Sequence, residues 1–333
     1  MTKAAAPVRQ ALADLPGPDL AARAAVARRA TEVLRPSGAL ARLDELAAWL
    51  AGWQRTDRPR VERPAVLVFV GDHGVVAEGV SAYGSEINHE MLRALRDGVA
   101  TASVMARQLG ARLEAVDVGV GRPTGNLRRE PALTAARFDE CLAIGRSAVA
   151  ALDADVVVLG EMGIGNTTAA AAVCATLFGG RPSEWTGRGA GIDDAGLRRK
   201  RAVVSAARRR VGAADPLDIL RQLGGTELVA LAGATLEARA RALPVILDGY
   251  VVGAAVAPLE VARPGTLDHC LAGHLSAEPG HRRLLDRLGM HPLLDLDLRL
   301  GEASGGMAAL ALVRLAAACV TDVATFAEWG LER

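Results

Sequence analysis

The sequence predicts an α/β fold with a doubly wound, mostly parallel sheet (Rossmann-like) and a smaller helical unit at its N-terminus. Three observations support this prediction. Short apolar segments alternate with longer helical ones along the chain. Glycine or polar loops follow the apolar segments. Hydrophobic residues make up 50% of the 333 positions and aromatic residues only 3%, so the core is built from Ala, Val and Leu, which suits helices packed closely on a sheet.

The strand candidates are short apolar runs bounded by turn residues. They lie at 65–70, 113–118, 155–159, 243–247, 267–274 and 293–298. The segments between them show helical periodicity, and the helix candidates are 85–109, 136–151, 168–177, 195–211, 226–242 and 304–320. A strand followed by a helix and another strand is the unit that builds a parallel sheet.

The first sixty residues are helical in pattern and precede the first strand. Leu43, Leu46 and Leu50 share one helix face after a break at 36–38. A chain of 333 residues corresponds to roughly two domains at about 150 residues each. We therefore expect residues 1–60 to form a helical unit packed with the C-terminal helix, and residues 61–333 to form the α/β domain.

Charge and composition exclude several classes of function. The net charge of +1 argues against nucleic-acid binding, and the basic runs at 198–201 and 208–210 indicate the solvated face of a helix. The four cysteines, at 141, 174, 270 and 319, form no C-x-x-C pair, which indicates a reducing, cytoplasmic setting. No signal-peptide core or membrane-spanning apolar run is apparent, so we expect no membrane partner.

Loops rich in glycine and polar residues follow the strand candidates, at 71–74, 119–121, 160–168, 248–249, 275–280 and 301–306. Ligands of open α/β sheets bind at the carboxyl ends of the strands, so these loops predict one large crevice. Asp72 and His73 are interpreted as structural, a helix cap and a packed imidazole. His269 and Cys270 face opposite sides of a strand, which argues against a shared metal site. We predict no metal.

The segment 160–168, GEMGIGNTT, has the pattern of a strand end, a glycine turn and a helix start. Such a turn presents backbone N–H groups to a phosphate, yet it lacks the Walker lysine and carries Glu161. The third glycine of a dinucleotide fingerprint is replaced by Thr168. Asp248 is a single acid where diphosphate-sugar phosphoribosyltransferases carry two adjacent acids, and no G-x-S-x-G elbow of a serine hydrolase is present.

Six motifs together resemble one family, the nicotinate-nucleotide:dimethylbenzimidazole phosphoribosyltransferases of cobalamin lower-ligand synthesis. The motifs are GDHGVVAEGVSAYGSEI (71–87), GEMGIGNTT (160–168), GAGIDDAGLRRKRAVV (189–204), LDGYVVGAA (247–255), HLSAEPGH (274–281) and LRLGEASGGMAALAL (298–312). They cover the chain from about residue 65 to 315 in the same order. The first sixty residues add little to the resemblance.

The resemblance implies transfer of the phosphoribosyl group of nicotinate mononucleotide to a benzimidazole nitrogen, giving α-ribazole phosphate and nicotinate. The phosphate is then a spectator monophosphate, and no metal or cofactor is implied. Lys200 matches the family's phosphate-side lysine, and Glu161 faces the ribose or the base. The implied nucleotide-binding residues are Gly160, Glu161, Met162, Gly163, Ile164, Gly165, Asn166, Thr167, Thr168, Lys200, Asp248 and Ser276.

The family's catalytic glutamate maps onto Glu302, which would take the proton that the attacking benzimidazole loses. Without the resemblance, Glu302 is better explained as an acid near a helix start, where it offsets the helix dipole. The implied base-binding residues are Ser81, Tyr83, Ser85 and Met307, with Ser85 standing where the family commonly has glutamine. The sequence therefore does not determine which base is preferred. The expected partners are the two substrates and a second copy in a homodimer.

Two other functions remain compatible with these patterns. A nucleotide-binding regulator would keep the phosphate loop and lack turnover, although retention of Glu161 and Glu302 speaks against it. An oxidoreductase would use the same crevice for a dinucleotide and would change the nicotinamide absorbance when substrate is added.

Overall fold

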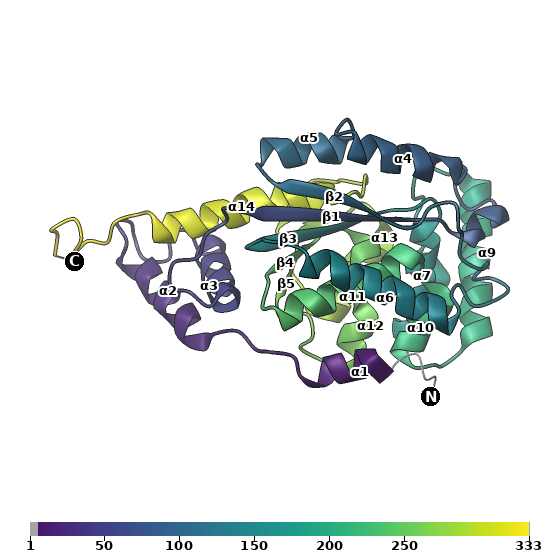
Figure 1. The fold of residues 1–333 in the computed structure, drawn as a ribbon, viewed down its shortest axis with the longest axis horizontal. Helices are drawn as coiled ribbons and strands as arrows, with labels where there is room; N and C mark the ends of the chain where they lie inside the picture. The colour runs from purple at the N-terminus through teal and green to yellow at the C-terminus, as the bar shows by residue number, and fades with distance from the viewer. Residues whose placement is uncertain (1–5, 333) are drawn as a thin grey trace.

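A computed structural model describes residues 6–332 of the chain. Its centre is a five-stranded sheet with the order β2-β1-β3-β4-β5, in which every neighbouring pair is parallel. The strands are β1 (Pro64–Gly71), β2 (Arg112–Gly119), β3 (Val156–Met162), β4 (Val245–Leu247) and β5 (Cys270–Ala272). Helices cover both faces of this sheet (Figure 1), which confirms the predicted doubly wound α/β fold.

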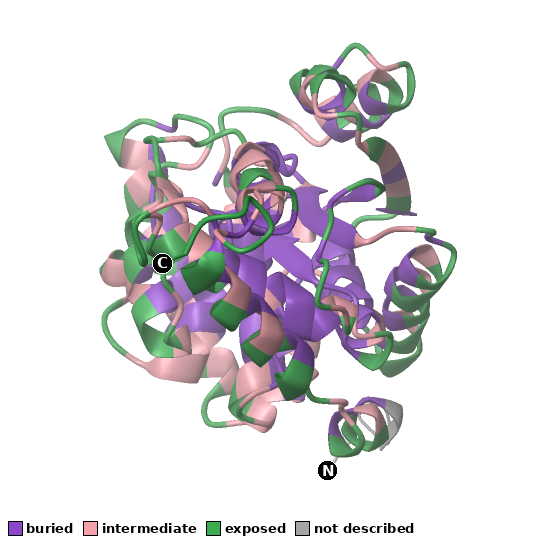
Figure 2. Ribbon diagram, turned by 90° about the vertical axis from the view of Figure 1, so that its left-hand side faces the viewer, coloured by how far each residue is buried: buried purple, intermediate pink, exposed green. Residues whose placement is uncertain are grey.

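Strand β1 divides its side chains between two hydrophobic cores. Successive residues of a strand point to opposite faces; positions 65, 67 and 69 join one core, and positions 66, 68 and 70 join the other. All six side chains are buried. The strand is therefore apolar without alternation, as expected for a central strand of a parallel sheet, and buried residues concentrate on the sheet and the helices that face it (Figure 2).

The two cores are covered by different helices. The core at positions 65, 67 and 69 packs against α6 (Ala135–Ala150), α7 (Asn166–Phe178), α11 (Thr226–Ala240) and α12 (Tyr250–Ala262). The other core packs against α4 (Glu86–Arg96), α5 (Thr101–Gln108) and α14 (Ser304–Thr321). The remaining segments after β1 are η2 (Gly74–Glu78), α8 (Pro182–Trp185), α9 (Asp194–Val211), α10 (Pro216–Leu223) and α13 (Pro279–Leu288).

Helix α14 is long and apolar enough to cross a membrane by length and composition, with a mean hydropathy of 1.6. However, 61% of it is buried within the protein. Its apolar side chains pack on the sheet and on α4 and α5, so the composition is that of a core helix.

The N-terminal helices divide between two places. Helices α2 (Leu20–Glu32) and α3 (Arg42–Gln54) pack on the end of α14, where Val26 and Leu46 share a cluster with Ala316 and Val320. Helix α1 (Ala6–Ala13) instead joins the core beside α11, far from α2 and α3 in Figure 1. Residues 1–5 of the predicted 1–60 unit lie outside the described residues, and the boundary at residue 60 stays a prediction.

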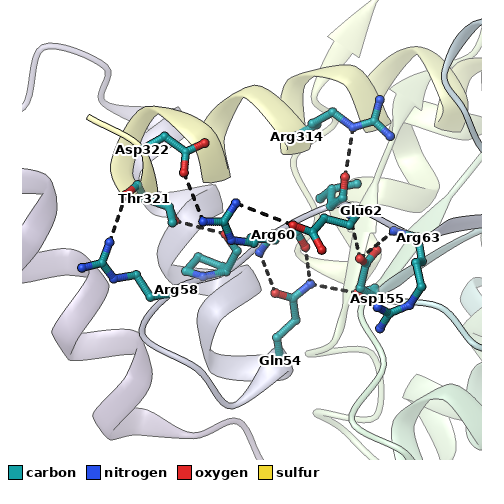
Figure 3. A network of polar contacts seen from close by, with 11 residues as sticks. Gln54, Arg58, Arg60, Glu62, Arg63, Asp155, Arg314, Thr321 and Asp322 are labelled. Atoms are coloured by element: carbon teal, nitrogen blue, oxygen red, sulfur yellow. Dashed lines mark hydrogen bonds and ion pairs between the residues drawn. The ribbon is translucent and has the colours of Figure 1, made fainter. Parts of the chain in front are cut away.

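A polar network joins α3 to the amino ends of β1 and β3 (Figure 3). The Gln54 Nε2 donates to the carbonyls of Arg60, at 2.7 Å, and Asp155, at 3.0 Å. The Asp155 Oδ2 accepts the N–H groups of Glu62 and Arg63, each at 2.7 Å. This network therefore lies at the amino ends of the strands, at the opposite end of the sheet from their carboxyl ends.

The structure corrects three predicted elements. The single helix expected at 85–109 is two helices, α4 and α5, with Gly98 between them at φ +77°. The strand expected at 267–274 breaks at Gly273 into β5 and β6 (His274–Leu275), and a Cβ at Gly273 would lie 2.8 Å from the Gly306 Cα of α14. The strand expected at 293–298 is only β7 (Leu294–Asp295), which pairs with β6 outside the main sheet.

Candidate active site

A cavity of about 250 Å³ opens at the carboxyl ends of β3 and β4. The strand order changes direction between β1 and β3. From β1 the chain continues to β2 on one side, and from β3 it continues to β4 on the other. The loops that follow β1 and β3 therefore run in opposite directions and leave a crevice between them. Segments that are far apart in sequence line it, at 80–91, 161–167, 189–200, 248–251, 274–278 and 299–302. We call it the active-site cavity.

Two predicted loops, 71–74 and 119–121, do not line this cavity. They are joined to each other, because the Asp72 Oδ2 accepts the Gly121 N–H at 2.9 Å. The neighbouring His73 Nε2 lies 2.5 Å from Glu227 Oε1, and both side chains are fully buried. A Cβ at Gly163 would lie 3.1 Å from that same Glu227 oxygen, so His73 and Glu227 pack directly against the glycine turn.

The glycine turn lies between the end of β3 at Met162 and the start of α7 at Asn166. Gly165 immediately precedes the helix with φ +93°, a left-handed conformation that glycine adopts without strain. The turn aims the N-terminus of α7 at the cavity, since residues 161–167 line it. A helix N-terminus with free backbone N–H groups favours an anion.

Only alternate N–H groups of this turn are free to bind a ligand. Those of residues 164, 166 and 168 donate within the protein, at 2.9, 3.1 and 2.9 Å respectively. Those of Gly163, Gly165 and Thr167 have no hydrogen-bond acceptor among residues 6–332. Half of the N–H groups from Gly163 to Thr168 therefore stabilise the turn itself, and the other half remain for an anion.

Lys200 of α9 places a buried ammonium group beside the N-terminus of α7, and the residue is 1% exposed. Its Nζ donates to the Thr167 Oγ1 at 2.7 Å. Burial lowers the pKa of Lys200 to about 8, and the Glu278 carboxylate opposes this effect. A Cβ at Gly189 would lie 3.2 Å from Nζ. Lys3 is the only other lysine in an arginine-rich chain, and a compact ammonium suits this confined place better than a guanidinium.

Two residues predicted for the nucleotide site lie outside the cavity wall. Thr168 is fully buried in α7, so its hydroxyl does not face the cavity as Thr167 does. Gly160 is inside β3, where a Cβ would lie 2.3 Å from the backbone nitrogen of Ala303. Gly160 therefore acts on the site indirectly, by allowing the segment that carries Glu302 to lie against β3.

Glu302 sits in an unusual backbone conformation before α14. The φ angles of Gly301, Glu302 and Ala303 are +83°, +56° and +64°, and left-handed conformations in non-glycine residues carry strain that clusters at functional sites. The Glu302 N–H donates to the Glu161 carbonyl at 3.0 Å, which ties the segment to the end of β3. The Glu302 side chain is 3% exposed and lines the cavity.

The Glu302 carboxyl group is poised to accept a proton. Burial raises its pKa, the nearby Asp248 charge raises it further, and the backbone N–H of Ala102 at the start of α5 opposes both. Its Oε2 is buried and has no hydrogen-bond partner among the described residues. A buried oxygen of this kind is costly unless a ligand completes it.

Two further carboxyl groups lie beside Glu302. Burial, followed by the Asp248 and Glu227 charges, raises the pKa of Glu161 well above its usual value, while a hydrogen bond from Asn166 opposes this. The Asp248 Oδ1 accepts the Gly306 N–H at 2.8 Å, which holds the N-terminus of α14. Burial raises the pKa of Asp248. Raised carboxyl pKa values in one cavity indicate a functional site.

Residues of the 80–91 segment form a mostly apolar part of the cavity wall, which we call the apolar slot. Ser81 and Tyr83 line it as predicted sites for the base, together with Val80, Ile87 and Met91. Sequence reasoning missed these last three, although the i, i+4 spacing of Ile87 and Met91 on α4 places that pair on one helix face.

Ser85 and Met307, the other predicted base-binding residues, do not line this slot. Ser85 precedes the first turn of α4, and Met307 is fully buried against the sheet.

Other lining residues follow from the HLSAEPGH segment. Ser276 lines the cavity, and its N–H and hydroxyl both lie 2.9 Å from His281 Nδ1. Glu278 was not predicted; its Oε1 accepts the Gly189 N–H at 2.9 Å beside Lys200. No cluster of three or more His, Cys, Asp or Glu side chains suited to a metal occurs within residues 6–332.

Comparisons with known proteins agree with this architecture. A family model described as phosphoribosyltransferase matches residues 15–331. The nicotinate-nucleotide–dimethylbenzimidazole phosphoribosyltransferase of Mesorhizobium japonicum is 49% identical over 327 residues, which cover 97% of each chain. The enzyme of the same name from Ruegeria pomeroyi is 48% identical, covering 97% of this chain and 96% of its own. The crystal structure of CobT from Thermus thermophilus superposes with a TM-score of 0.89 at 41% identity, covering 94% of this chain and 99% of that chain.

Proposed function

The chain belongs to the nicotinate-nucleotide–dimethylbenzimidazole phosphoribosyltransferase family, and we propose how its active-site cavity carries out the reaction. The enzyme transfers the phosphoribosyl group of nicotinate mononucleotide to 5,6-dimethylbenzimidazole, in the lower-ligand branch of cobalamin biosynthesis. The products are α-ribazole 5′-phosphate and nicotinate. The observation that carries the assignment of roles is the arrangement of one cavity, which brings together the glycine turn and a Glu302 carboxyl group whose Oε2 has no hydrogen-bond partner among the described residues.

The 5′-phosphate of nicotinate mononucleotide binds at the N-terminus of α7. The free N–H groups of Gly163, Gly165 and Thr167 donate to its oxygens, and the Lys200 ammonium adds a full positive charge. The phosphate keeps all its bonds during the reaction, so its binding contributes orientation. Glu161 lines the cavity at the end of β3, next to this turn, and we assign it to the sugar hydroxyl groups, from which its carboxyl oxygens can accept hydrogen bonds.

The chemical step exchanges one C1′–N bond for another. A bare benzimidazole nitrogen attacks C1′ from the face opposite nicotinate, the bond to the pyridinium nitrogen breaks, and its electron pair returns to the ring, which leaves as a neutral pyridine. The configuration changes from β to α. The benzimidazole then carries the positive charge, and the Glu302 carboxylate takes the N–H proton of its second nitrogen.

The apolar slot receives the benzimidazole. Ile87 and Met91 of α4 form one wall and Tyr83 lies at the rim, 53% exposed. A flat aromatic ring gains free energy from burial against such surfaces. The preferred base depends on these side chains, because Ser85, where the family commonly has glutamine, does not line the slot.

Incubating the purified protein with nicotinate mononucleotide and a panel of benzimidazoles, with products identified by mass spectrometry, tests the proposal. We expect a product with the mass of α-ribazole phosphate and an equal amount of nicotinate. A protein that binds the nucleotide yet forms no product with any base would instead be a nucleotide-binding regulator.

We also propose that the protein is a cytoplasmic homodimer. Tyr83 and Leu300 at the cavity rim are 53% and 50% exposed, and a second copy that covers them would shield the base from water. The four free cysteines fit a reducing compartment. Sedimentation equilibrium and cell fractionation test the two statements; a monomer at micromolar concentration would contradict the first.

A further inference from the structure

Asn88 is a fully buried amide on α4, and its side chain holds three partners. Its Nδ2 donates to the Asp72 Oδ1 at 2.6 Å and to the Gly71 carbonyl at 3.3 Å. Its Oδ1 accepts the Ile164 N–H at 2.9 Å. One side chain therefore connects the end of β1, the phosphate-binding turn after β3, and helix α4.

The bond to Ile164 uses one N–H group of the turn within the protein, so that this group is not available to a ligand. Because Asn88 takes the Ile164 N–H, the peptide at that position is rotated into the protein, and the neighbouring N–H groups of Gly163 and Gly165 remain free. A turn without this bond would have to satisfy the Ile164 N–H with another acceptor, such as a bound anion or water.

Helix α4 gives this contact a second consequence. Ile87 and Met91, on either side of Asn88 along the helix, line the slot for the base. The element that receives one substrate is thus hydrogen-bonded to the turn that receives the other.

We propose that Asn88 is a positioning residue for the reaction: held by Asp72, it orients the turn so that the free N–H groups meet the nucleotide phosphate. The proposal rests on the proposed function, because it assumes that a phosphate monoester binds at this turn. Asn88 touches neither substrate, and it acts through the Ile164 peptide.

A purely structural role for Asn88 explains less. Leu92 and Leu95 lie on the buried side of α4, so apolar side chains fill that side where packing is the only requirement. A buried amide is costly unless its hydrogen bonds are made, and the oxygen of this one is directed at the phosphate-binding turn. Packing alone does not explain why the Asn88 Oδ1 accepts its hydrogen bond from the backbone N–H of a loop residue, Ile164.

The first experiment compares two ligands on the Asn88→Ala protein. Calorimetry measures the affinity for nicotinate mononucleotide and for the matching riboside, which lacks the phosphate. We expect the variant to lose about tenfold in affinity for the nucleotide, the scale of one charge-assisted hydrogen bond, and to bind the riboside as the parent does. The matched control is Ser103→Ala, which removes another buried hydrogen bond of the α4–α5 pair, from Ser103 Oγ to the Leu95 carbonyl at 3.0 Å. It should leave the ratio of the two affinities unchanged.

The second experiment exchanges the hydrogen-bond donor and acceptor between positions 72 and 88. Asn88→Asp alone places two carboxyl groups at hydrogen-bond distance, and their repulsion should weaken nucleotide binding further. In the double variant Asp72→Asn with Asn88→Asp, an amide at position 72 donates to a carboxylate at 88, which still accepts the Ile164 N–H and loses only the longer bond to the Gly71 carbonyl. The amide oxygen at 72 still accepts the Gly121 N–H. We expect the double variant to regain most of the parent's preference for nucleotide over riboside.

Equal losses for nucleotide and riboside in Asn88→Ala would overturn the proposal. If that variant does not fold, the double variant decides the matter, and a folded double variant without the preference for nucleotide is equally fatal. Failure of the proposed function looks different. In that case the parent forms no α-ribazole phosphate, or fails to distinguish nucleotide from riboside, before any substitution is made.

Discussion

Replacing Lys200 with Met should stabilise the protein while it weakens nucleotide binding. Burial lowers the pKa of Lys200 from 10.5 to about 8, and at about 1.4 kcal/mol per pKa unit this corresponds to about 3 kcal/mol of destabilisation at pH 7. Methionine fills a similar space without charge but loses the hydrogen bond to Thr167, which is worth about 1 kcal/mol. The expected net gain in unfolding free energy is about 2 kcal/mol.

The sign of the pH dependence gives an independent check on Lys200. Its folded-state pKa lies below the unfolded value, so between pH 8 and pH 10.5 the unfolded chain binds more protons. The unfolding free energy contributed by Lys200 therefore rises with pH across this window. The advantage of Lys200→Met should be full below pH 8 and should shrink as pH rises towards 10.5.

Urea unfolding of parent and variant at pH 7 and pH 9.5 measures both effects. Arg198→Met is the matched control, because Arg198 lies on the exposed side of α9 and should change stability by less than about 0.5 kcal/mol. A phosphate bound beside Lys200 favours its charged form, so nucleotide affinity should fall at least tenfold in the variant, by about 1.5–3 kcal/mol. Refutation would be a Lys200→Met protein that is less stable than the parent, or whose stability difference is the same at both pH values.

Four other outcomes are expected. Glu302→Gln should lower kcat by about 10²–10⁴ and leave nucleotide binding intact, since a general base matters only as the proton becomes acidic; a single-turnover rate equal to the parent's would move the role to Glu161. The acidic limb of the kcat profile should lie above the usual glutamate range, because burial raises the pKa of Glu302 and the basic form is lost as pH falls through that raised value; an acidic limb at the ordinary glutamate pKa would argue against this residue. Activity should survive exhaustive treatment with EDTA, because the leaving group is already a pyridinium and the phosphate is not broken; recovery only after adding magnesium or zinc would contradict the mechanism. Gly160→Ala should lower both stability, by about 1–3 kcal/mol, and kcat, because the new Cβ would lie 2.3 Å from the Ala303 nitrogen; thermal melting and turnover measured together would expose an unaffected protein.

The parts of the fold that were predictable are those where one local pattern determines the outcome. The run at 65–70 is apolar because both of its faces are buried, so it predicts a central strand without any knowledge of its neighbours. The break at Gly98 was missed because one glycine inside a helical pattern costs only about 1 kcal/mol. The loss of strand at Gly273 depends on how closely α14 approaches, which no local pattern records.

The site was predictable where a motif carries its own geometry. The glycine turn at 160–168 does so, and the resemblance added the identity of its ligand. The alternation of free and used N–H groups was not predictable, because the partner of Ile164 is Asn88, which lies far away in the sequence. The burial of Met307 against the sheet was not predictable for a related reason. Its distance in sequence from Glu302 says nothing about the left-handed segment that turns α14 onto the sheet.

Two kinds of evolutionary change in α4 should have different consequences for the enzyme. Ile87 and Met91 can be exchanged for larger or smaller side chains on one helix face, so the range of accepted bases can drift, or be engineered, without altering Glu302 or Lys200. An insertion or deletion within the same helix would instead rotate Asn88 away from Ile164. Lineages adapting to a new lower ligand should therefore show substitutions along this helix and an unchanged length between Gly84 and Asn88.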